Sequence, residues 1–144
     1  DPAPFVRDID QLIRKVDFLT PNQKEAELLT NSELKDLESV HRALLKMKGL
    51  TRAICIITMG PEGLFFLSGD ELIHVPSSSV LSVDSVAAGD AFTAGLAVGI
   101  SEGLTLSVAA ELGSAAGALA TTKRGAQISM PSRIEVDSLM GKTN

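Results

Sequence analysis

Hydrophobic residues recur at helical spacing in two segments of the first half of the chain. A repeat of three to four residues places apolar side chains on one face of a helix. The two stripes consist of Phe5, Val6, Ile9, Leu12, Ile13 and Val16, and of Leu34, Leu37, Val40, Leu44 and Leu45. The second stripe predicts a longer helix that ends near Gly49, because glycine is common just past a helix end.

Short apolar runs rich in branched and aromatic residues predict strands between these helices. "VDFL" (16–19) is a short strand candidate, and "RAICIIT" (52–58) is a strand that we expect to be buried on both faces. "GLFFLS" and "ELIHVP" flank Gly69-Asp70. A Gly-Asp pair between two alternating runs predicts a β-hairpin.

The second half of the chain changes character after Asp84. From Ala87 to Ala120 nearly every position is Ala, Gly, Ser, Leu or Val, and Gly103 separates two predicted helices. Their apolar stripes are Phe92, Leu96 and Ile100, and Val108, Leu112, Ala116 and Leu119. Small side chains let neighbouring helices approach closely, so we expect this pair to be buried. A loop follows, and then a short terminal helix from about Pro131.

Strands that alternate with helices indicate a layered α/β fold with at least one hairpin. Thr20 followed by Gln23 three residues later predicts the start of a brief helix over 22–29. In open sheets of this kind, ligands bind beyond the carboxyl ends of the strands. Asn22 and Asp84 both follow predicted strands, so we expect them to share one crevice.

Composition narrows the class of protein. A chain of 144 residues, 44% hydrophobic and 22% charged, is long enough for one domain with a real core. The net charge of −5 and the 3% aromatic content argue against a nucleic-acid partner or an anionic membrane surface. The single cysteine, Cys55, forms no internal disulfide, which predicts a cytoplasmic protein. No leader or bilayer-spanning run is present, and the start "DPAPFVRDI" suggests a portion of something longer.

The stretch "VDSVAAGDAF" (83–92) carries the strongest chemical signal. Helix amino-termini present unpaired N–H groups and a partial positive charge, and small side chains there let an anion reach the amides. Asp90 at that position suits the removal of a proton from an alcohol that attacks a phosphate. The alternative is that Asp90 only caps a helix, and on this stretch alone capping is the simpler interpretation.

Three other stretches add candidates, each with a simpler alternative. Asn22 and Glu25 offer oxygen ligands for Mg²⁺ at a helix start, or merely an ordinary acidic first turn. "TMGPEG" (58–63) contains two glycines that allow tight turns near a ligand, or simply joins two strands. Lys123 and Arg124 are candidate phosphate partners or part of a solvated loop. The two histidines lie far apart without cysteine companions, which favours structural roles over a zinc site.

Taken together, these motifs resemble a known family. "DPAP", "TPNQKEAELLT", "TMGPEG", "VDSVAAGDAF" and "KRGAQ" occur in the order seen in the carboxyl-terminal half of the ribokinase-like (phosphofructokinase-B type) sugar kinases, and are most similar to the ribokinase branch. The resemblance covers almost all of the chain. It implies a three-layer αβα Rossmann-like sheet that is incomplete here, with residues 1–144 forming a single nucleotide-binding and catalytic portion.

The resemblance also implies roles for individual residues. Asp90 corresponds to the catalytic base, and the backbone of 87–90 corresponds to an anion hole, with Ala87 where many members have Gly. Asn22 and Glu25 correspond to a motif that handles Mg²⁺, with Glu25 acting through water. The implied nucleotide contacts are Thr58, Gly60, Gly63 and Gly113. The implied ligands of a monovalent cation, expected to be K⁺, are Asp84, Val86, Ala120, Lys123, Gly125 and Ser129.

The implied activity is the ATP-dependent phosphorylation of a sugar hydroxyl, with ribose as the favoured acceptor and a homodimer as the full-length form. Fructose and nucleosides remain open as acceptors. The alternative from another class is a non-catalytic, nucleotide-binding regulatory fragment. Because positioning dominates phosphoryl transfer, we expect this chain alone to have little or no kinase activity.

Overall fold

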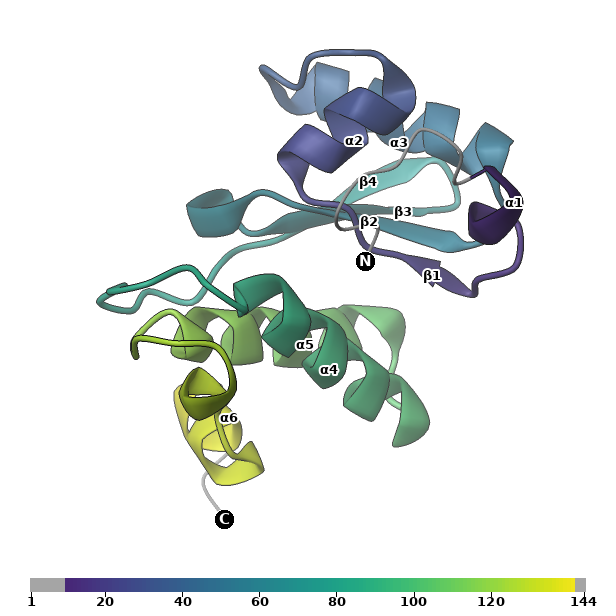
Figure 1. Ribbon diagram of the computed structural model, residues 1–144. Helices are drawn as coiled ribbons and strands as arrows, with labels where there is room; N and C mark the ends of the chain where they lie inside the picture. Colours follow the sequence, from purple (N-terminus) through teal and green to yellow (C-terminus); the bar gives the residue numbers. More distant parts are fainter. Residues whose placement is uncertain (1–9, 142–144) are drawn as a thin grey trace. The chain divides into compact units, whose positions relative to one another are not determined.

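The computed structural model describes residues 10–141, and the chain divides into two compact units, residues 1–74 and 75–144, which are considered one at a time (Figure 1). Of the first predicted stripe, Phe5, Val6 and Ile9 lie outside the described residues. Ile13 is buried, but Leu12 and Val16 are exposed, and the helix ends at Ile13. Unit 1 contains α1 (Asp10–Ile13), β1 (Phe18–Leu19), α2 (Gln23–Thr30), α3 (Leu37–Leu50), β2 (Ile54–Thr58), η1 (Gly60–Glu62), β3 (Leu64–Ser68) and β4 (Glu71–Val75, whose last residue opens unit 2). Unit 2 contains α4 (Ala88–Ser101), α5 (Leu106–Ala120), η2 (Gln127–Ser129) and α6 (Arg133–Leu139).

The sheet of unit 1 is mixed, with the strand order β1-β2-β3-β4. β1 pairs with β2 in parallel, Phe18 opposite Ile54, whereas β2 pairs with β3 antiparallel, Ile56 opposite Phe66. The predicted hairpin is confirmed: β3 and β4 are joined at Gly69-Asp70, where Gly69 adopts a φ of +66° that favours glycine.

Helices α2 and α3 cover one face of this sheet (Figure 1). The core between them is formed by Leu19, Ala26, Leu34, Val40, Ala43, Leu44, Met47, Cys55, Ile57 and Phe65. Two expectations need correction. Leu37 and Leu45 are exposed, because the buried face of α3 runs through 40, 43, 44 and 47, and Leu45 is turned about 100° away from Leu44. In β2, Ile54 is also exposed, so burial on both faces begins at Cys55.

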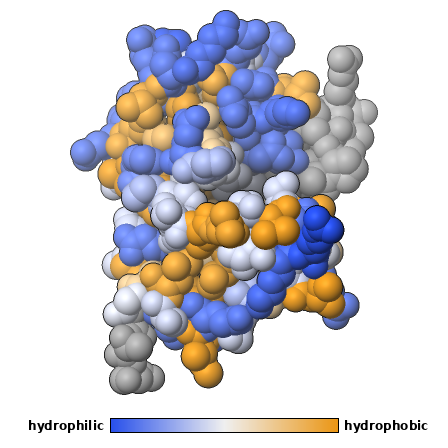
Figure 2. All heavy atoms as spheres, turned by 90° about the vertical axis from the view of Figure 1, so that its left-hand side faces the viewer, coloured by the Kyte–Doolittle hydropathy of each residue, from blue (hydrophilic) through white to orange (hydrophobic). Residues whose placement is uncertain are grey.

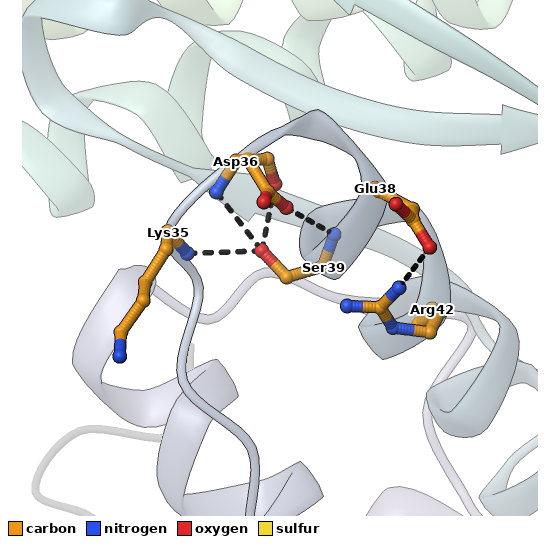
Figure 3. A network of polar contacts seen from close by, with 5 residues as sticks. All are labelled: Lys35, Asp36, Glu38, Ser39 and Arg42. Atoms are coloured by element: carbon orange, nitrogen blue, oxygen red, sulfur yellow. Dashed lines mark hydrogen bonds and ion pairs between the residues drawn. The ribbon is translucent and has the colours of Figure 1, made fainter.

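The start of α3 is held by a dense set of local hydrogen bonds (Figure 3). Asp36 Oδ1 accepts from the Ser39 amide at 2.8 Å, and Ser39 Oγ accepts from the amides of Lys35 and Asp36 at 2.9 and 3.0 Å. Glu38 and Arg42 form an ion pair on the outer surface one turn further on. The reciprocal pair satisfies amides that the helix itself leaves unpaired, and so fixes where α3 begins.

Helix α2 begins at a different residue from the one predicted. Its N-cap is Asn22 rather than Thr20. The Thr58 amide donates to the Pro21 carbonyl at 3.0 Å, and Asn22 bridges to Thr58, so the chain is still extended beside β2 at that point. Asn22 is therefore the first residue free to cap. The Thr20 hydroxyl is buried without a hydrogen-bond partner among the described residues.

Helices α4 and α5 of unit 2 pack at very short range, as their small residues predict. A Cβ on Gly95 would lie 2.9 Å from Gly113 Cα, and one on Gly99 would lie 2.8 Å from Ala109 Cα. Atoms at such distances clash, so only glycine permits this spacing. The buried cluster of this unit comprises Ala91, Leu112, Ala115, Ala116, Ala120 and Val136, with Val136 contributed by α6.

Asp84 does not directly follow a strand, contrary to expectation. The segment between Val75 and Ala88 contains no strand in the described chain. Its main chain is held instead by Thr121, whose carbonyl accepts from the amides of Val83 and Asp84 at 2.7 and 3.0 Å. Within residues 10–141, no helix combines the length and apolarity needed to cross a bilayer.

Candidate active site

The amino-terminus of α4 offers two free backbone amides. The N–H groups of Gly89 and Asp90 have no acceptor within the described part of unit 2, whereas the Ala88 amide donates to Ser85 O over a long 3.3 Å. The chain enters the helix through Ala87, whose φ of +62° is a left-handed conformation that alanine seldom adopts. Free N–H groups and the helix dipole make this tip attractive to an anion.

Asp90 lies in the first turn of α4 with an exposed side chain. It is not the N-cap: that position is Ala87, which has no side-chain cap bond. Among the described residues of unit 2, Asp90 forms neither an ion pair nor a side-chain hydrogen bond to the helix amides. The capping interpretation is therefore wrong for Asp90. Its carboxylate remains available to an incoming molecule.

Asp84 joins the loop before α4 to the loop after α5. Its Oδ1 accepts from the Val86 amide at 3.1 Å and its Oδ2 from the Gly125 amide at 3.2 Å. These two backbone hydrogen bonds, first that of Val86 and then that of Gly125, lower the pKa of Asp84 from its ordinary value. The carboxylate is thus ionised and held between the two loops at neutral pH.

Several oxygens in these two loops have no N–H partner. The carbonyls of Val86, Ala120, Lys123 and Gly125 accept no hydrogen bond within the described part of unit 2. Ser129 is fully buried, and its hydroxyl donates to Ala126 O at 2.7 Å, which leaves its oxygen lone pairs free. The donor set that the resemblance implies for a monovalent cation is therefore chemically suitable, because alkali cations take oxygen ligands.

The two basic residues of the 121–125 loop differ in their side-chain contacts. The Lys123 ammonium forms an ion pair with Glu135 of α6 at 3.0 Å. Glu135 also accepts from the Ser132 amide at 2.7 Å as part of the α6 capping box. Lys123 is therefore committed to α6 through its side chain, and its proposed cation-binding role concerns only its carbonyl. Arg124 is exposed.

The candidate residues of unit 1 meet at the ends of β1 and β2. Asn22 Oδ1 accepts from the Glu25 amide at 3.1 Å, and Glu25 Oε2 accepts from the Asn22 amide at 2.9 Å. Thr58 bridges to Asn22 across the parallel pair. Glu25 is only 7% exposed, so it is not the solvated acidic residue of the simpler alternative. One of its oxygens is used by the cap, and the other remains for a water ligand.

The turn at 59–63 is closed by three main-chain hydrogen bonds. Met59 N donates to Gly63 O at 2.8 Å, Glu62 N to Met59 O at 3.1 Å, and Gly63 N to Gly60 O at 3.0 Å. Gly60 and Gly63 have φ values of +53° and +91°, which explains both glycines. The Gly60 N–H has no acceptor in the described part of unit 1, so one amide of this turn is free for a ligand.

Gly113 has a packing role that the motif analysis did not foresee. It is buried in α5, and a Cβ there would lie 2.8 Å from the Phe92 carbonyl oxygen. Its predicted place beside the nucleotide stays a prediction.

Within residues 10–141, no group of three or more His, Cys, Asp or Glu side chains is arranged to hold a metal ion. A divalent ion would therefore depend on ligands from the substrate as well as on Asn22 and Glu25.

Both histidines donate a hydrogen bond to a backbone carbonyl. The sequence indicated structural roles for them but did not indicate these partners. His74 Nε2 bonds Glu62 O at 2.7 Å, and His41 Nε2 bonds Asp70 O at 2.8 Å.

The surface of unit 2 also carries exposed apolar side chains, which Figure 2 shows in orange in its lower part. The most exposed of these are Leu81, Ile128 and Ile134. Neither the histidine contacts nor these exposed apolar side chains have a signal in the motifs.

Comparison with known proteins identifies the family of this chain. The family model described as "pfkB family carbohydrate kinase" matches residues 1–133. A ribokinase from Haemophilus influenzae is 34% identical over 135 residues, 94% of this chain and 44% of that protein. The crystal structure of a ribokinase from Thermotoga maritima matches 98% of this chain and 48% of its own, with a TM-score of 0.87 and 35% identity. That of Arabidopsis thaliana ribokinase complexed with ribose and ATP matches 91% and 43%, with a TM-score of 0.83 and 29% identity.

These matches confirm the predicted ribokinase-like α/β fold in its incomplete form. The chain spans less than half the length of the relatives cited here. The family match extends over far more than half of the chain and includes both units. The chain belongs to the pfkB family of carbohydrate kinases.

Proposed function

We propose that the protein containing this chain transfers a phosphoryl group from ATP to a sugar hydroxyl. The observation that carries the proposal is the tip of α4, where the free amides of Gly89 and Asp90 lie beside an exposed, unpaired carboxylate. Charge that develops on a transferring phosphoryl group is stabilised by such preorganised donors. A nearby carboxylate supplies the base that the attacking alcohol needs.

The reaction at this tip follows from those groups. Asp90 takes the proton of the sugar hydroxyl as its oxygen bonds to the γ-phosphorus of ATP, and the bond from that phosphorus to the β,γ-bridging oxygen breaks. ADP leaves with the electron pair of that bond. The backbone from 87 to 90 corresponds to the proposed anion hole, in which Gly89 and Asp90 contribute the free amides.

Two cations complete the proposed chemistry. Mg²⁺ would neutralise the phosphates, and the Glu25 oxygen left free by the cap would hold one of its water ligands, while Asn22 orients Glu25 through the reciprocal cap. K⁺ would be held by the Asp84 carboxylate, the Ser129 hydroxyl and four carbonyls. Those carbonyls belong to Val86, Ala120, Lys123 and Gly125. A cation at this place lowers the energy of anionic charge at the adjoining helix tip.

The nucleotide contacts are proposed for the end of β2 and for α5. Thr58, Gly60 and Gly63 belong to the turn with one free amide, and Gly113 belongs to α5. Ribose is the favoured acceptor, because the Haemophilus and Thermotoga relatives are named ribokinases and the Arabidopsis structure is described as a complex with ribose and ATP. Fructose and nucleosides are the competing acceptors.

The cellular setting of the proposal is a cytoplasmic enzyme that acts as a homodimer in its full-length form. The buried Cys55 thiol, whose pKa burial raises to about 11, is unreactive, and a reducing compartment suits it. Exposed apolar residues such as Leu81 and Ile134 are consistent with a surface that contacts another protein. The isolated chain is expected to bind nucleotide and to catalyse little transfer.

The proposal is tested by assaying the full-length protein with ATP and Mg²⁺ against ribose, deoxyribose, fructose and adenosine. We expect ADP release with a sugar, and the highest kcat/KM with ribose. A different best acceptor would correct the substrate but keep the reaction. Binding of a non-hydrolysable ATP analogue without turnover on any acceptor would favour the regulatory alternative instead.

A further inference from the structure

We propose that His74 is a positioning residue for nucleotide binding, because it holds the 59–63 turn (Met59–Gly63) in its binding conformation. The inference rests on the proposed function, in which this turn contacts ATP. His74 lies in β4, outside the motifs that carry the family resemblance. Its contacts connect the strand to the turn.

The His74 ring is fixed on two sides. It stacks on Phe65 with the ring centroids 4.5 Å apart and an interplanar angle of 11°. Its Nε2 lies 2.7 Å from the Glu62 carbonyl oxygen. A carbonyl only accepts, so the ring carries a proton on Nε2 and donates it. Phe65 is a fully buried core residue, so the ring is a rigid link from the core of unit 1 to the turn.

The bond to Glu62 O fixes the orientation of one peptide plane. The peptide that carries Glu62 O also carries Gly63 N–H, which donates to Gly60 O at 3.0 Å. Gly63 has a φ of +91° and a ψ of −137°, and a glycine can rotate this peptide at little steric cost. His74 opposes that rotation, because rotation would remove the acceptor of its Nε2–H.

Rotation of the 62–63 peptide would also affect the free amide of the turn. If the 62–63 peptide rotated, Gly60 O would lose its donor, and the left-handed Gly60 would no longer be held in place. Gly60 carries the N–H that is left unpaired for a ligand. His74 therefore lowers the entropic cost of nucleotide binding by keeping that amide in one orientation.

His41, which lies in α3, provides a matched control because it bonds the turn of the same hairpin. Its Nε2 donates to Asp70 O at 2.8 Å, at the 69–70 turn that joins β3 and β4, whereas His74 acts on the turn that precedes β3. Both bonds have the same chemistry, although His41 is half-buried and His74 is exposed. A role limited to hairpin stability predicts equal consequences for the two histidines. A positioning role predicts that only His74 affects the nucleotide.

The experiment measures binding of a non-hydrolysable ATP analogue by calorimetry, in the full-length protein, for the wild type and for His74→Phe, His74→Gln and His41→Phe. His74→Phe keeps a ring on Phe65 but removes the donor, and His74→Gln restores a donor without the ring. We expect His74→Phe to raise Kd about threefold to tenfold, the effect of one lost hydrogen bond. His74→Gln should recover part of the loss, and His41→Phe should leave Kd unchanged.

Steady-state kinetics supplies the second readout. KM for ATP should rise in His74→Phe while kcat changes less than about twofold, because the variant alters the population of the binding conformation rather than the chemical step. Equal Kd values for His74→Phe and His41→Phe in a protein that binds ATP would overturn this inference alone. Absence of nucleotide binding by the wild type would overturn the proposed function, and this inference with it.

Discussion

The carboxylate of Asp84 accepts a hydrogen bond from the amide of Gly125 across 41 residues of sequence. This contact connects the loop that leads into α4 with the loop that follows α5. Because Asp84 also accepts from Val86, the same side chain orders the residues immediately before the proposed anion hole. The position of the helix tip thus depends on one ionised group.

Replacement of Asp84 by Asn should remove much of the K⁺ dependence of the full-length enzyme. Asn offers one acceptor oxygen where Asp84 offers two, so the bond to Val86 or to Gly125 is lost. We expect activation by K⁺ over Na⁺ to fall about tenfold, the scale of one charge-assisted hydrogen bond. Turnover is measured in K⁺, Na⁺ and choline, with Asp70→Asn as the control. Equal wild-type turnover in all three salts would contradict the cation site.

Ala87→Gly should be neutral or stabilising. Alanine at a φ of +62° costs roughly 1–2 kcal/mol, and glycine removes this cost while adding up to about 1 kcal/mol of unfolded-chain entropy. Ala97, exposed in the interior of α4, is the control, because Ala97→Gly should destabilise by about 0.5–1 kcal/mol. Denaturant unfolding measures both. If Ala87→Gly were as destabilising as Ala97→Gly, strain at residue 87 would be excluded.

Gly113→Ala should destabilise unit 2 by about 1–3 kcal/mol. Its Cβ would lie 2.8 Å from Phe92 O and 2.9 Å from Phe92 Cδ2, so α4 and α5 would have to separate. Gly49 in α3 has no neighbour within 4 Å of the same atom, and Gly49→Ala should instead stabilise by up to about 1 kcal/mol. Thermal unfolding compares them. A tolerated Gly113→Ala would mean that the two helices are not held at this spacing.

The hairpin and the α4–α5 pair were predictable because they depend on local chemistry. Gly69-Asp70 needs only a turn residue with positive φ, and the run of small residues from 87 to 120 needs only close packing. The N-cap of α2 was mispredicted because Thr58, more than 30 residues away, keeps Pro21 extended. Pairing between distant segments has no local signature.

The candidate site also combines features that have a local sequence signal with features that have none. The tip of α4 was recognisable from "VAAGD", because bare amides require small residues. The contacts of Asp84 with Gly125, and of His74 with Glu62, depend on where loops meet after folding. The burial of Leu45 in α3 was mispredicted for a geometric reason, since the sequence pattern does not distinguish a leucine next to the buried stripe from one within it.

The ion pair of Glu135 with Lys123 should resist mild acid. The amide of Ser132, and then Lys123, lower the pKa of Glu135 from 4.5 to about 2. A lowered folded-state pKa stabilises the protein above pH 4.5, and this contribution is lost as the pH falls towards 2. Gln keeps the capping geometry without the charge. The difference in unfolding free energy between wild type and Glu135→Gln should shrink only below pH 4.5, and a constant difference down to pH 2.5 would contradict this assignment.

The most direct test of the central claim is the turnover of Asp90→Asn in the full-length protein. Asn preserves the shape of the side chain but cannot accept the proton, so turnover should fall by roughly 10²–10⁴-fold, while Kd for a non-hydrolysable ATP analogue stays within about threefold. Glu111→Gln, an exposed carboxylate of α5, is the control and should keep wild-type turnover. If Asp90→Asn turned over at the wild-type rate, Asp90 would not be the base, and the proposed chemistry at the tip of α4 would be wrong.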